Sequence, residues 1–256
     1  MTTLYKQAAA KGPGGAARLV RYLGMPIFLG VACLALYLYI SSKKLDSIER
    51  RNINADVIIH QTARLVELAA VSTVIVVILA VTAGILLTRP LTRRVTPAII
   101  GVANIGQAVP SIGLLALFAI VWDIGFWPAI VAFVAYSFLS ILRNTMVGLQ
   151  QVDRSTIEAA RGMGMTKMAV LFRIELPLAV PIILAGIRTA LIINVGTATL
   201  GTFIGAGGLG EMINNALRLG RYDTVLVVGS GLTAILALFI DWLGGVAEDI
   251  LRPKGL

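Results

Sequence analysis

Long apolar runs constrain the fold of this chain more than any other feature. An α-helix needs about 20 mostly apolar residues to cross the hydrocarbon of a bilayer, and six stretches of the 256-residue sequence approach or reach that length. Because 57% of the residues are hydrophobic and 14% are charged, a soluble domain of this size could not bury its apolar surface. The sequence therefore predicts an all-α polytopic membrane protein with about six transmembrane helices. The predicted spans are residues 23–40, 68–87, 99–121, 126–142, 178–200 and 224–243.

The net charge of +9 indicates an orientation in the membrane and not a nucleic-acid partner. The basic residues stand at the ends of the apolar runs instead of along one face, which is the positive-inside pattern. If the spans alternate, most of them fall on the side of both termini, which is therefore expected to be cytoplasmic. Residues 41–64, with basic and acidic side chains together, fall on the opposite side. The cytoplasmic side would hold the N-terminal tail (residues 1–22), Arg89, Arg93, Arg94, residues 143–173, Arg252 and Lys254.

The first apolar run is expected to be a retained span and not a secretory signal. It is long for the apolar region of a signal peptide, and no A-x-A-like cleavage site stands near its end.

Two of the predicted spans contain residues that interrupt a helix. Pro110 in the third span cannot donate a backbone hydrogen bond and clashes with the preceding turn, so a kink or break is expected there. The fifth span ends in a glycine-rich stretch, residues 196–210, where Gly201 and Gly205 have the spacing that lets another backbone approach closely. The glycines that follow predict a turn leaving the membrane. They are Gly207, Gly208 and Gly210.

Two polar segments between the spans are expected to lie outside the hydrocarbon. Residues 53–67 are of mixed polarity and predict a helix at or outside the membrane surface before the second span. Residues 158–177 (EAARGMGMTKMAVLFRIELP) are partly amphipathic, and a short structured element of this kind is typical of docking to a soluble partner. Ser155 and Glu158 have the form of a capping box for its first helix, with Asp153 as a competing N-cap.

Glycines divide this second segment into two short helices. Gly162 or Gly164 can end the first helix in a left-handed conformation, and a second amphipathic helix is predicted over residues 166–175, with Pro177 as its stop. Leaving a large apolar side chain in water costs roughly 1.5–3 kcal/mol. Such side chains in this segment either fold back on the protein's own helices or fill a groove in a partner. They are Met163, Met165, Met168, Leu171 and Phe172.

The same segment resembles the signature loop of bacterial ABC importer permeases. The pattern is E-A-A, then a glycine six residues after the glutamate, then I-x-L-P, and it is matched by Glu158, Ala159, Ala160, Gly164, Ile174, Leu176 and Pro177. In that family the loop forms coupling helices, which insert into a groove on the ATPase subunit. The resemblance implies a type I, MetI-like transmembrane domain over residues 23–256. It also implies an ATPase-coupling segment at residues 153–177, to which Gly162 and Met165 contribute.

Phrases between residues 60 and 242 resemble the glycine betaine/carnitine/choline branch of these permeases. They include ANIGQAVPSIGLLAL, LRNTMVGLQQVD, LAGIRTA and GTATLGTFIGAGGLG. Members of this branch import quaternary ammonium osmoprotectants across the bacterial cytoplasmic (inner) membrane. The implied partners are two ATP-binding cassette subunits, which hold the ATP and Mg²⁺, and a second permease subunit, identical or homologous. A separate extracytoplasmic substrate-binding protein is also implied, because no fused binding domain follows the last span.

The sequence offers no site for ATP chemistry or other catalysis. It lacks the G-x-x-x-x-G-K-[ST] loop that cradles phosphates, so hydrolysis is assigned to a partner and no cofactor is expected in this chain. The single Cys33 and the single His60 are far apart, which excludes the paired catalytic groups of an intramembrane enzyme. His60 has no other metal-ligand type at a suitable spacing, so no metal site is expected.

Polar side chains within the spans are candidates for a weak, transient substrate path, because such groups normally face the interior of a bundle. Interhelical hydrogen bonding is the alternative for each of them. Arg188 in the fifth span needs a partner, since an unpaired charge there costs several kcal/mol, and Asp241 lies at a matching depth in the sixth. The candidate pathway residues are Asn104, Gln107, Ser111, Asn194, Thr197 and Thr199.

Two other functions fit parts of the sequence. An ABC permease for methionine or another small solute would carry an identical loop, so only uptake or the neighbouring binding protein would separate the two. A secondary transporter or channel would work without an ATPase and would not need the cytoplasmic loop. It would normally show more spans, repeats or intramembrane carboxylates.

Overall fold

The computed structural model describes residues 15–92, 94–220 and 223–251, and every regular element in these residues is helical. The chain divides into a first unit, Met1–Lys44, which holds α2 (Gly15–Ser42), and a second unit, Leu45–Leu256. Most of the predicted N-terminal tail, Arg93, Arg252 and Lys254 lie outside the described residues. The second unit contains α3 (Ser47–Asn52), α4 (Ala55–Leu87), η1 (Pro90–Thr92), α5 (Thr96–Ala108), α6 (Ser111–Val121), α7 (Phe126–Gln150), α8 (Arg154–Gly162), α9 (Lys167–Val170), η2 (Leu171–Glu175), α10 (Leu176–Leu200), η3 (Gly201–Ile204), α11 (Gly210–Leu219) and α12 (Asp223–Leu251).

The predicted polytopic all-α fold is confirmed. Five of the described helices are long and apolar enough to cross a membrane, and there are six if the bent pair α5–α6 counts as one span. The helices extend past several predicted ends, because α7 continues to Gln150 and α12 to Leu251.

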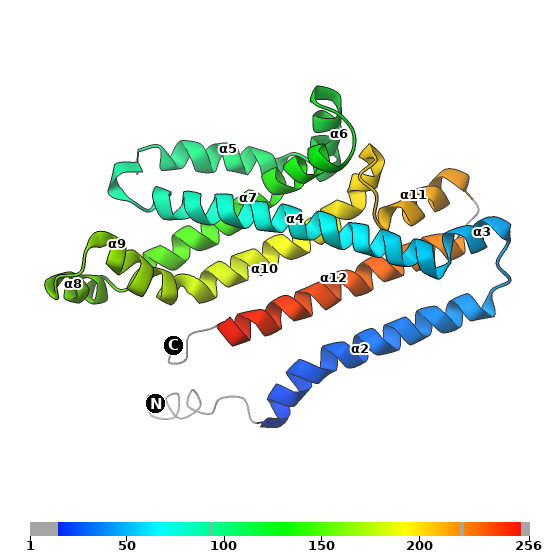
Figure 1. Cartoon of the computed structure of the whole chain (residues 1–256), viewed down its shortest axis with the longest axis horizontal. Coiled ribbons are helices and arrows are strands. Elements are labelled where there is room, and N and C mark those ends of the chain that lie inside the picture. Colours follow the sequence, from blue (N-terminus) through cyan, green and yellow to red (C-terminus); the bar gives the residue numbers. More distant parts are fainter. Residues whose placement is uncertain (1–14, 93, 221–222, 252–256) are drawn as a thin grey trace, which may run out of the picture. The chain divides into compact units, whose positions relative to one another are not determined.

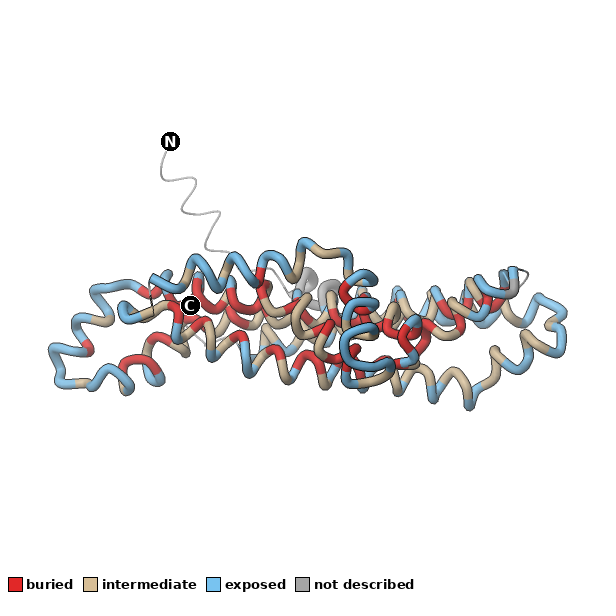
Figure 2. Tube along the Cα trace, turned by 90° about the horizontal axis from the view of Figure 1, so that it is seen from above, coloured by how far each residue is buried: buried red, intermediate tan, exposed pale blue. Residues whose placement is uncertain are grey.

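The centre of the second unit is formed by α4, α7 and α10, which run along one another (Figure 1). Buried positions recur along all three helices, and buried positions are drawn in red in Figure 2. The helices approach closely where one of them has no side chain: a Cβ at Gly84 would lie 2.7 Å from Thr145 Cβ, and one at Gly186 would lie 2.5 Å from Asn144 Cβ. Small residues at helix crossings are the usual means of close packing in membranes. The same three helices share a buried apolar cluster that includes Val76, Leu142 and Ala190.

The predicted pair of Arg188 and Asp241 is confirmed, and it joins α10 to α12. Arg188 Nε donates to Asp241 Oδ1 at 2.6 Å, and a terminal guanidinium nitrogen donates to Oδ2 at 2.9 Å. Glu248, two turns further along α12, lies 3.7 Å from the same guanidinium. Gly245 leaves room for it, since a Cβ there would lie 3.3 Å from Arg188 Nη1.

The predicted break at Pro110 is also confirmed. Helix α5 ends at Ala108, Val109 has an extended backbone, and α6 begins at Ser111. The two helices meet at an angle of 99°. A proline that cannot donate to the helix ladder therefore turns the third apolar run into two short helices that pack on α7.

The glycine-rich stretch turns where predicted, at Gly207 and Gly208, whose φ angles of 85° and 97° lie in the left-handed region. The expectation that Gly201 and Gly205 form one close-packing face is wrong. A Cβ at Gly201 would lie 3.1 Å from the Phe133 ring, but one at Gly205 would meet nothing within 4 Å. Helix α10 ends at Leu200 and is followed by the 3-10 helix η3, so a spacing of four residues no longer places the two glycines on the same face of an α-helix.

Residues 55–67 are helical, as predicted for residues 53–67, but they do not form a separate helix, because α4 runs without a break from Ala55 to Leu87. Polar side chains in this part of α4 form hydrogen bonds with the glycine-rich loop. Gly208 N donates to Gln61 Oε1 at 2.9 Å, and Arg64 Nε donates to the Ala206 carbonyl at 3.0 Å. We call Gln61, Arg64 and loop residues 205–208 the glycine-loop clasp.

Candidate functional site

The predicted coupling segment, residues 153–177, lies at one end of the bundle, opposite the end that carries α3 and α11 (Figure 1). Its first helix, α8, begins after Asp153, whose carboxylate accepts from Ser155 N at 3.0 Å and from Ser155 Oγ at 2.9 Å. The predicted capping box of Ser155 and Glu158 is therefore wrong, because Asp153 occupies both the Ser155 amide and its hydroxyl. These two hydrogen bonds, that of the amide first, hold the pKa of Asp153 below its usual value.

The predicted glycine stop is confirmed. Helix α8 ends at Gly162, and Gly164 has φ 88°. This left-handed residue turns the chain so that Met165 N donates to the Ala160 carbonyl at 3.2 Å and Gly164 N donates to the Arg161 carbonyl at 2.9 Å. Glycine adopts the conformation without the steric cost that a Cβ would add.

The second predicted helix does not stop at Pro177. Thr166 caps α9, with its hydroxyl accepting from Ala169 N at 3.3 Å, and the helix continues through a π-helical turn, η2, into the spanning helix α10. Pro177 stands in the first turn of α10. A proline is tolerated there because that position does not need its own amide hydrogen bond. The wider π turn accommodates the change in the backbone hydrogen-bond pattern.

The apolar ridge of the segment divides between the protein's interior and its surface. Leu171 is buried, whereas Met163, Met168 and Phe172 are 77%, 62% and 59% exposed. The buried part folds back on the protein's own helices, which is one of the alternatives left open by the sequence, and the exposed part remains available to a partner. Of the predicted coupling residues, Ala160 is buried, Met165, Ile174, Leu176 and Pro177 are half-buried, and Glu158, Ala159, Gly162 and Gly164 are exposed.

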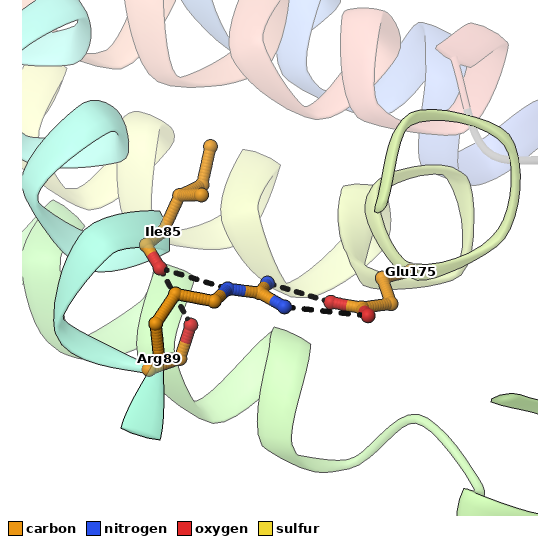
Figure 3. A network of polar contacts seen from close by, with 4 residues as sticks. Ile85, Arg89 and Glu175 are labelled. Atoms are coloured by element: carbon orange, nitrogen blue, oxygen red, sulfur yellow. Dashed lines mark hydrogen bonds and ion pairs between the residues drawn. The ribbon is translucent and has the colours of Figure 1, made fainter. Parts of the chain in front are cut away.

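An ion pair missed by the sequence analysis fixes the end of this segment. Glu175 in η2 is buried, and its Oε2 lies 2.6 Å from Nη2 of Arg89, which follows α4 (Figure 3). A second contact joins Arg89 Nη1 to Glu175 Oε1 at 3.4 Å, and Arg89 Nε donates to the Ile85 carbonyl at 3.3 Å. The available signal was a carboxylate between Ile174 and Leu176, at the start of the apolar run that forms α10.

Of the candidate pathway residues on α5, two reach toward α7. Asn104 is exposed, and its Oδ1 accepts from Arg143 at 2.8 Å. Gln107 is half-buried and donates to the Tyr136 carbonyl at 3.1 Å. Ser111 is half-buried at the start of α6.

The candidates on α10 lie deeper. Asn194 is fully buried and donates to Thr73 Oγ1 of α4 at 2.9 Å. Thr197 and Thr199 donate to carbonyls one turn back on their own helix, those of Ile193 and Val195. The two sets thus lie in different surroundings, because Asn104 and Gln107 are exposed or half-buried beside α7, whereas Asn194 and Thr197 are buried within the bundle.

Two cavities open beside the coupling segment. The larger, about 890 Å³, is lined by residues of α5 and α7, including Asn104 and Gln150, and by the charged residues Arg89 and Arg154. The smaller, about 530 Å³, shares both arginines and adds Glu158, Arg161 and Glu175. In residues 15–92, 94–220 and 223–251, no group of three or more His, Cys, Asp or Glu side chains is placed to hold a metal ion.

Comparisons with known proteins agree with this architecture. Residues 80–251 match the family described as the binding-protein-dependent transport system inner membrane component. The chain is 40% identical over 204 residues to the glycine betaine/carnitine/choline transport system permease protein OpuCB of Bacillus subtilis, covering 79% of this chain and 92% of that protein. It is 39% identical over 225 residues to the osmoprotectant import permease protein OsmY of Salmonella typhimurium, covering 88% and 92%.

Solved structures give the same fold. A chain of the MetNI methionine ABC transporter in an inward-facing conformation matches with a TM-score of 0.69 and 25% identity, over 77% of this chain and 96% of that chain. These findings confirm the resemblance noted in the sequence. The chain belongs to the binding-protein-dependent ABC importer permeases, membrane-spanning subunits whose ATPase lies in a partner subunit and which work with a substrate-binding protein.

Proposed function

We propose that this chain is the permease of an ATP-driven importer that moves quaternary ammonium osmoprotectants, such as glycine betaine, choline and carnitine, into the bacterial cytoplasm. The observation that carries the proposal is the 40% identity to OpuCB, which extends over 92% of that protein. Similarity to the MetNI permease makes methionine the second candidate substrate, but the identity there is 25%. Recognition of the methylated nitrogen is assigned to an aromatic cage on the binding protein, through cation–π attraction.

The test of the substrate is uptake into proteoliposomes that contain the permease, its ATPase subunits and its binding protein. Radiolabelled glycine betaine should accumulate, and excess choline or carnitine should compete for the same permease when each is supplied with its own binding protein. Methionine should not accumulate. Accumulation of methionine without uptake of any quaternary ammonium solute would replace the proposal with its alternative.

The coupling segment is proposed to receive motion from the ATPase subunit. Exposed Met168 and Phe172 present apolar surface for a partner's groove, and the left-handed turn at Gly164 fixes the angle between α8 and α9. The contributing residues are Glu158, Ala159, Ala160, Gly162, Gly164, Met165, Ile174, Leu176 and Pro177.

The test of this role is Gly164→Val, because a β-branched residue at φ 88° is strained by about 1–3 kcal/mol. Transport per ATP hydrolysed should fall by between about 5-fold and about 150-fold, while the permease still inserts in the membrane. Normal transport in this variant would remove the role.

The assembly that follows from this function has one permease paired with a second, identical or homologous, two ATPase subunits that bind ATP and Mg²⁺, and a separate extracytoplasmic binding protein. The coupling segment, both termini and the tail of residues 1–22 then lie in the cytoplasm, with residues 23–256 as the transmembrane domain. A cysteine introduced at the exposed Ser155 should react with a membrane-impermeant maleimide only from the cytoplasmic side. Reaction from the outside would invert the topology.

A substrate path is proposed along the polar candidates Asn104, Gln107, Ser111, Asn194, Thr197 and Thr199. The α5 residues support it best, since Asn104 lines the larger cavity. Replacing Asn104, Gln107 and Ser111 together by alanine should lower flux and leave assembly intact. Replacing Asn194, Thr197 and Thr199 should lower both flux and stability, because Asn194 also bonds to Thr73. Unchanged flux in both triple variants would end the pathway assignment.

A further inference from the structure

We propose that the Arg89–Glu175 ion pair is the joint through which the coupling segment moves the end of α4 and the start of α5. The two residues act by positioning and make no contact with ATP or solute. The proposal rests on the coupling function proposed above and names the connection inside this chain on which that function depends.

The coupling segment meets the bundle through an apolar contact and an ionic one. The apolar contact is a buried cluster in which Leu171 of η2 meets Leu149 of α7 and Ile183 of α10, with Ile85 of α4 at its edge. Contacts of this kind are non-directional. A contact of defined geometry between the segment and the end of α4 must therefore come from polar groups.

The ionic contact supplies that direction. The Glu175 side chain is only 7% exposed, and its two carboxylate oxygens face two nitrogens of Arg89 at 2.6 and 3.4 Å. The third guanidinium nitrogen, Nε, is occupied by the Ile85 carbonyl (Figure 3). The guanidinium is therefore bonded to Glu175 on one side and to the Ile85 carbonyl on the other. Because its planar geometry is rigid, it transmits a displacement of Glu175 to the last turn of α4.

Toward the coupling side, Glu175 follows any displacement of α9. The helical run is continuous from Lys167 through η2 into α10, so a partner that shifts the exposed Met168 or Phe172 also shifts Glu175. The π-helical turn Leu171–Glu175 lies within this run, and such turns recur at functional sites in helices.

Toward the transport side, Arg89 is tied to the beginning of α5. Thr92 N donates to the Arg89 carbonyl at 3.2 Å, and Thr96 Oγ1, at the start of α5, donates to the Thr92 carbonyl at 3.0 Å. Arg89, Thr96 and Asn104 all line the larger cavity. A shift of Glu175 therefore reaches the wall of that cavity through Arg89 and α5.

The test is Glu175→Gln in the transporter reconstituted with its ATPase subunits and binding protein, with glycine betaine as solute. The amide keeps the shape of the side chain and removes the charge that holds Arg89. Assembly and basal ATP hydrolysis should be retained, while solute transported per ATP hydrolysed should fall by between about 2-fold and about 30-fold. A purely structural pair would lower hydrolysis and transport in parallel, and a ratio equal to that of the wild type overturns the proposal.

Arg89→Lys keeps the charge and loses the fork, so it decides the question if Glu175→Gln does not assemble. The amount of solute transported per ATP hydrolysed should again fall, and an unchanged ratio overturns the proposal. Glu67→Gln is the matched control, since it removes the exposed Arg64–Glu67 pair of 2.8 Å on α4, away from the coupling segment, and should leave the ratio unchanged.

Gly164→Val in the same preparation separates this joint from the coupling function itself. If Gly164→Val lowers the ratio and Glu175→Gln does not, the joint is wrong and the coupling function stands. If neither lowers it, both are wrong.

Discussion

The two ends of the bundle differ in what their side chains contact: polar side chains bond within the chain at one end, and apolar side chains stay exposed at the other. At one end, the side chains of Gln61 and Arg64 in the glycine-loop clasp bond to backbone groups of a loop that lies far away in the sequence. The bonded residues are 147 and 142 positions apart. Arg64 also lies over the Phe126 ring at 4.5 Å. At the other end, the coupling segment leaves Met168 and Phe172 exposed. The clasped end is tied within the chain, whereas the coupling end is fixed at its base and open toward a partner.

The largest difference is expected from adding a single methyl group at each end. A Cβ at Gly210 would lie 1.9 Å from the Thr199 carbonyl oxygen, so Gly210→Ala should lower the free energy of unfolding by at least about 3 kcal/mol. A Cβ at Gly162 in α8 would meet nothing within 4 Å, so Gly162→Ala should change the free energy of unfolding by less than about 0.5 kcal/mol. Thermal unfolding in detergent, followed by tryptophan fluorescence, measures both. Equal losses would show that the two ends do not differ in packing.

The next effect should appear in partner binding and not in stability. Replacing Met168 and Phe172 together by alanine should weaken binding of the ATPase subunit by about 30-fold, or about 2 kcal/mol. The free energy of unfolding should stay within about 0.5 kcal/mol of the wild-type value, because both side chains are exposed. Ile59→Ala, at a similarly exposed apolar residue near the clasped end, is the control and should leave that affinity unchanged. An affinity unchanged by the double variant would mean that the exposed ridge does not dock.

A converse experiment at the clasped end should affect stability. Gln61→Ala removes the acceptor of the Gly208 amide and the partner of Glu211, so it should cost about 1–2 kcal/mol. Amide hydrogen exchange in residues 205–210 should accelerate. His60→Ala, at the exposed neighbouring position, should do neither. If loop exchange were the same in Gln61→Ala as in the wild type, the clasp would not hold the loop.

How far the sequence predicted these features depends on whether their cause is local. Apolar runs, the donor that Pro110 lacks and the left-handed conformation at Gly164 act within a few residues, and each was predicted correctly. The α4 extension was missed because its polar side chains are satisfied by a distant loop. The Arg89–Glu175 pair joins positions 86 residues apart, and no local pattern identifies such a partner.

The N-cap of α8 shows the same limit on a smaller scale. Ser155 and Glu158 match a capping box, yet the structure uses Asp153, because a carboxylate accepts from the Ser155 amide and hydroxyl together. Composition alone does not rank two competing caps that stand two residues apart. A capping box does form elsewhere, at Asp46 and Glu49, where both reciprocal hydrogen bonds are present.

The smallest expected effect is the pH dependence of this cap. The pKa of Asp153 in the folded protein lies below its usual value of 3.8, so the carboxylate stabilises α8 fully above that pH. The stabilisation is lost as the pH falls through the folded pKa. Amide exchange in α8, corrected for intrinsic rates, should therefore be faster at about pH 3 than at about pH 5. Asp153→Asn should reduce this pH dependence, and an equal dependence in both proteins would assign it to another group.

Accumulation of glycine betaine by sealed vesicles, with and without the ATPase subunits, tests the central claim most directly. If the coupling end receives its motion from a partner, solute should accumulate against its gradient only when the ATPase subunits and ATP are present on the side of the coupling segment. Accumulation of equal extent in vesicles that contain the permease alone, driven by an ion gradient, would contradict the account.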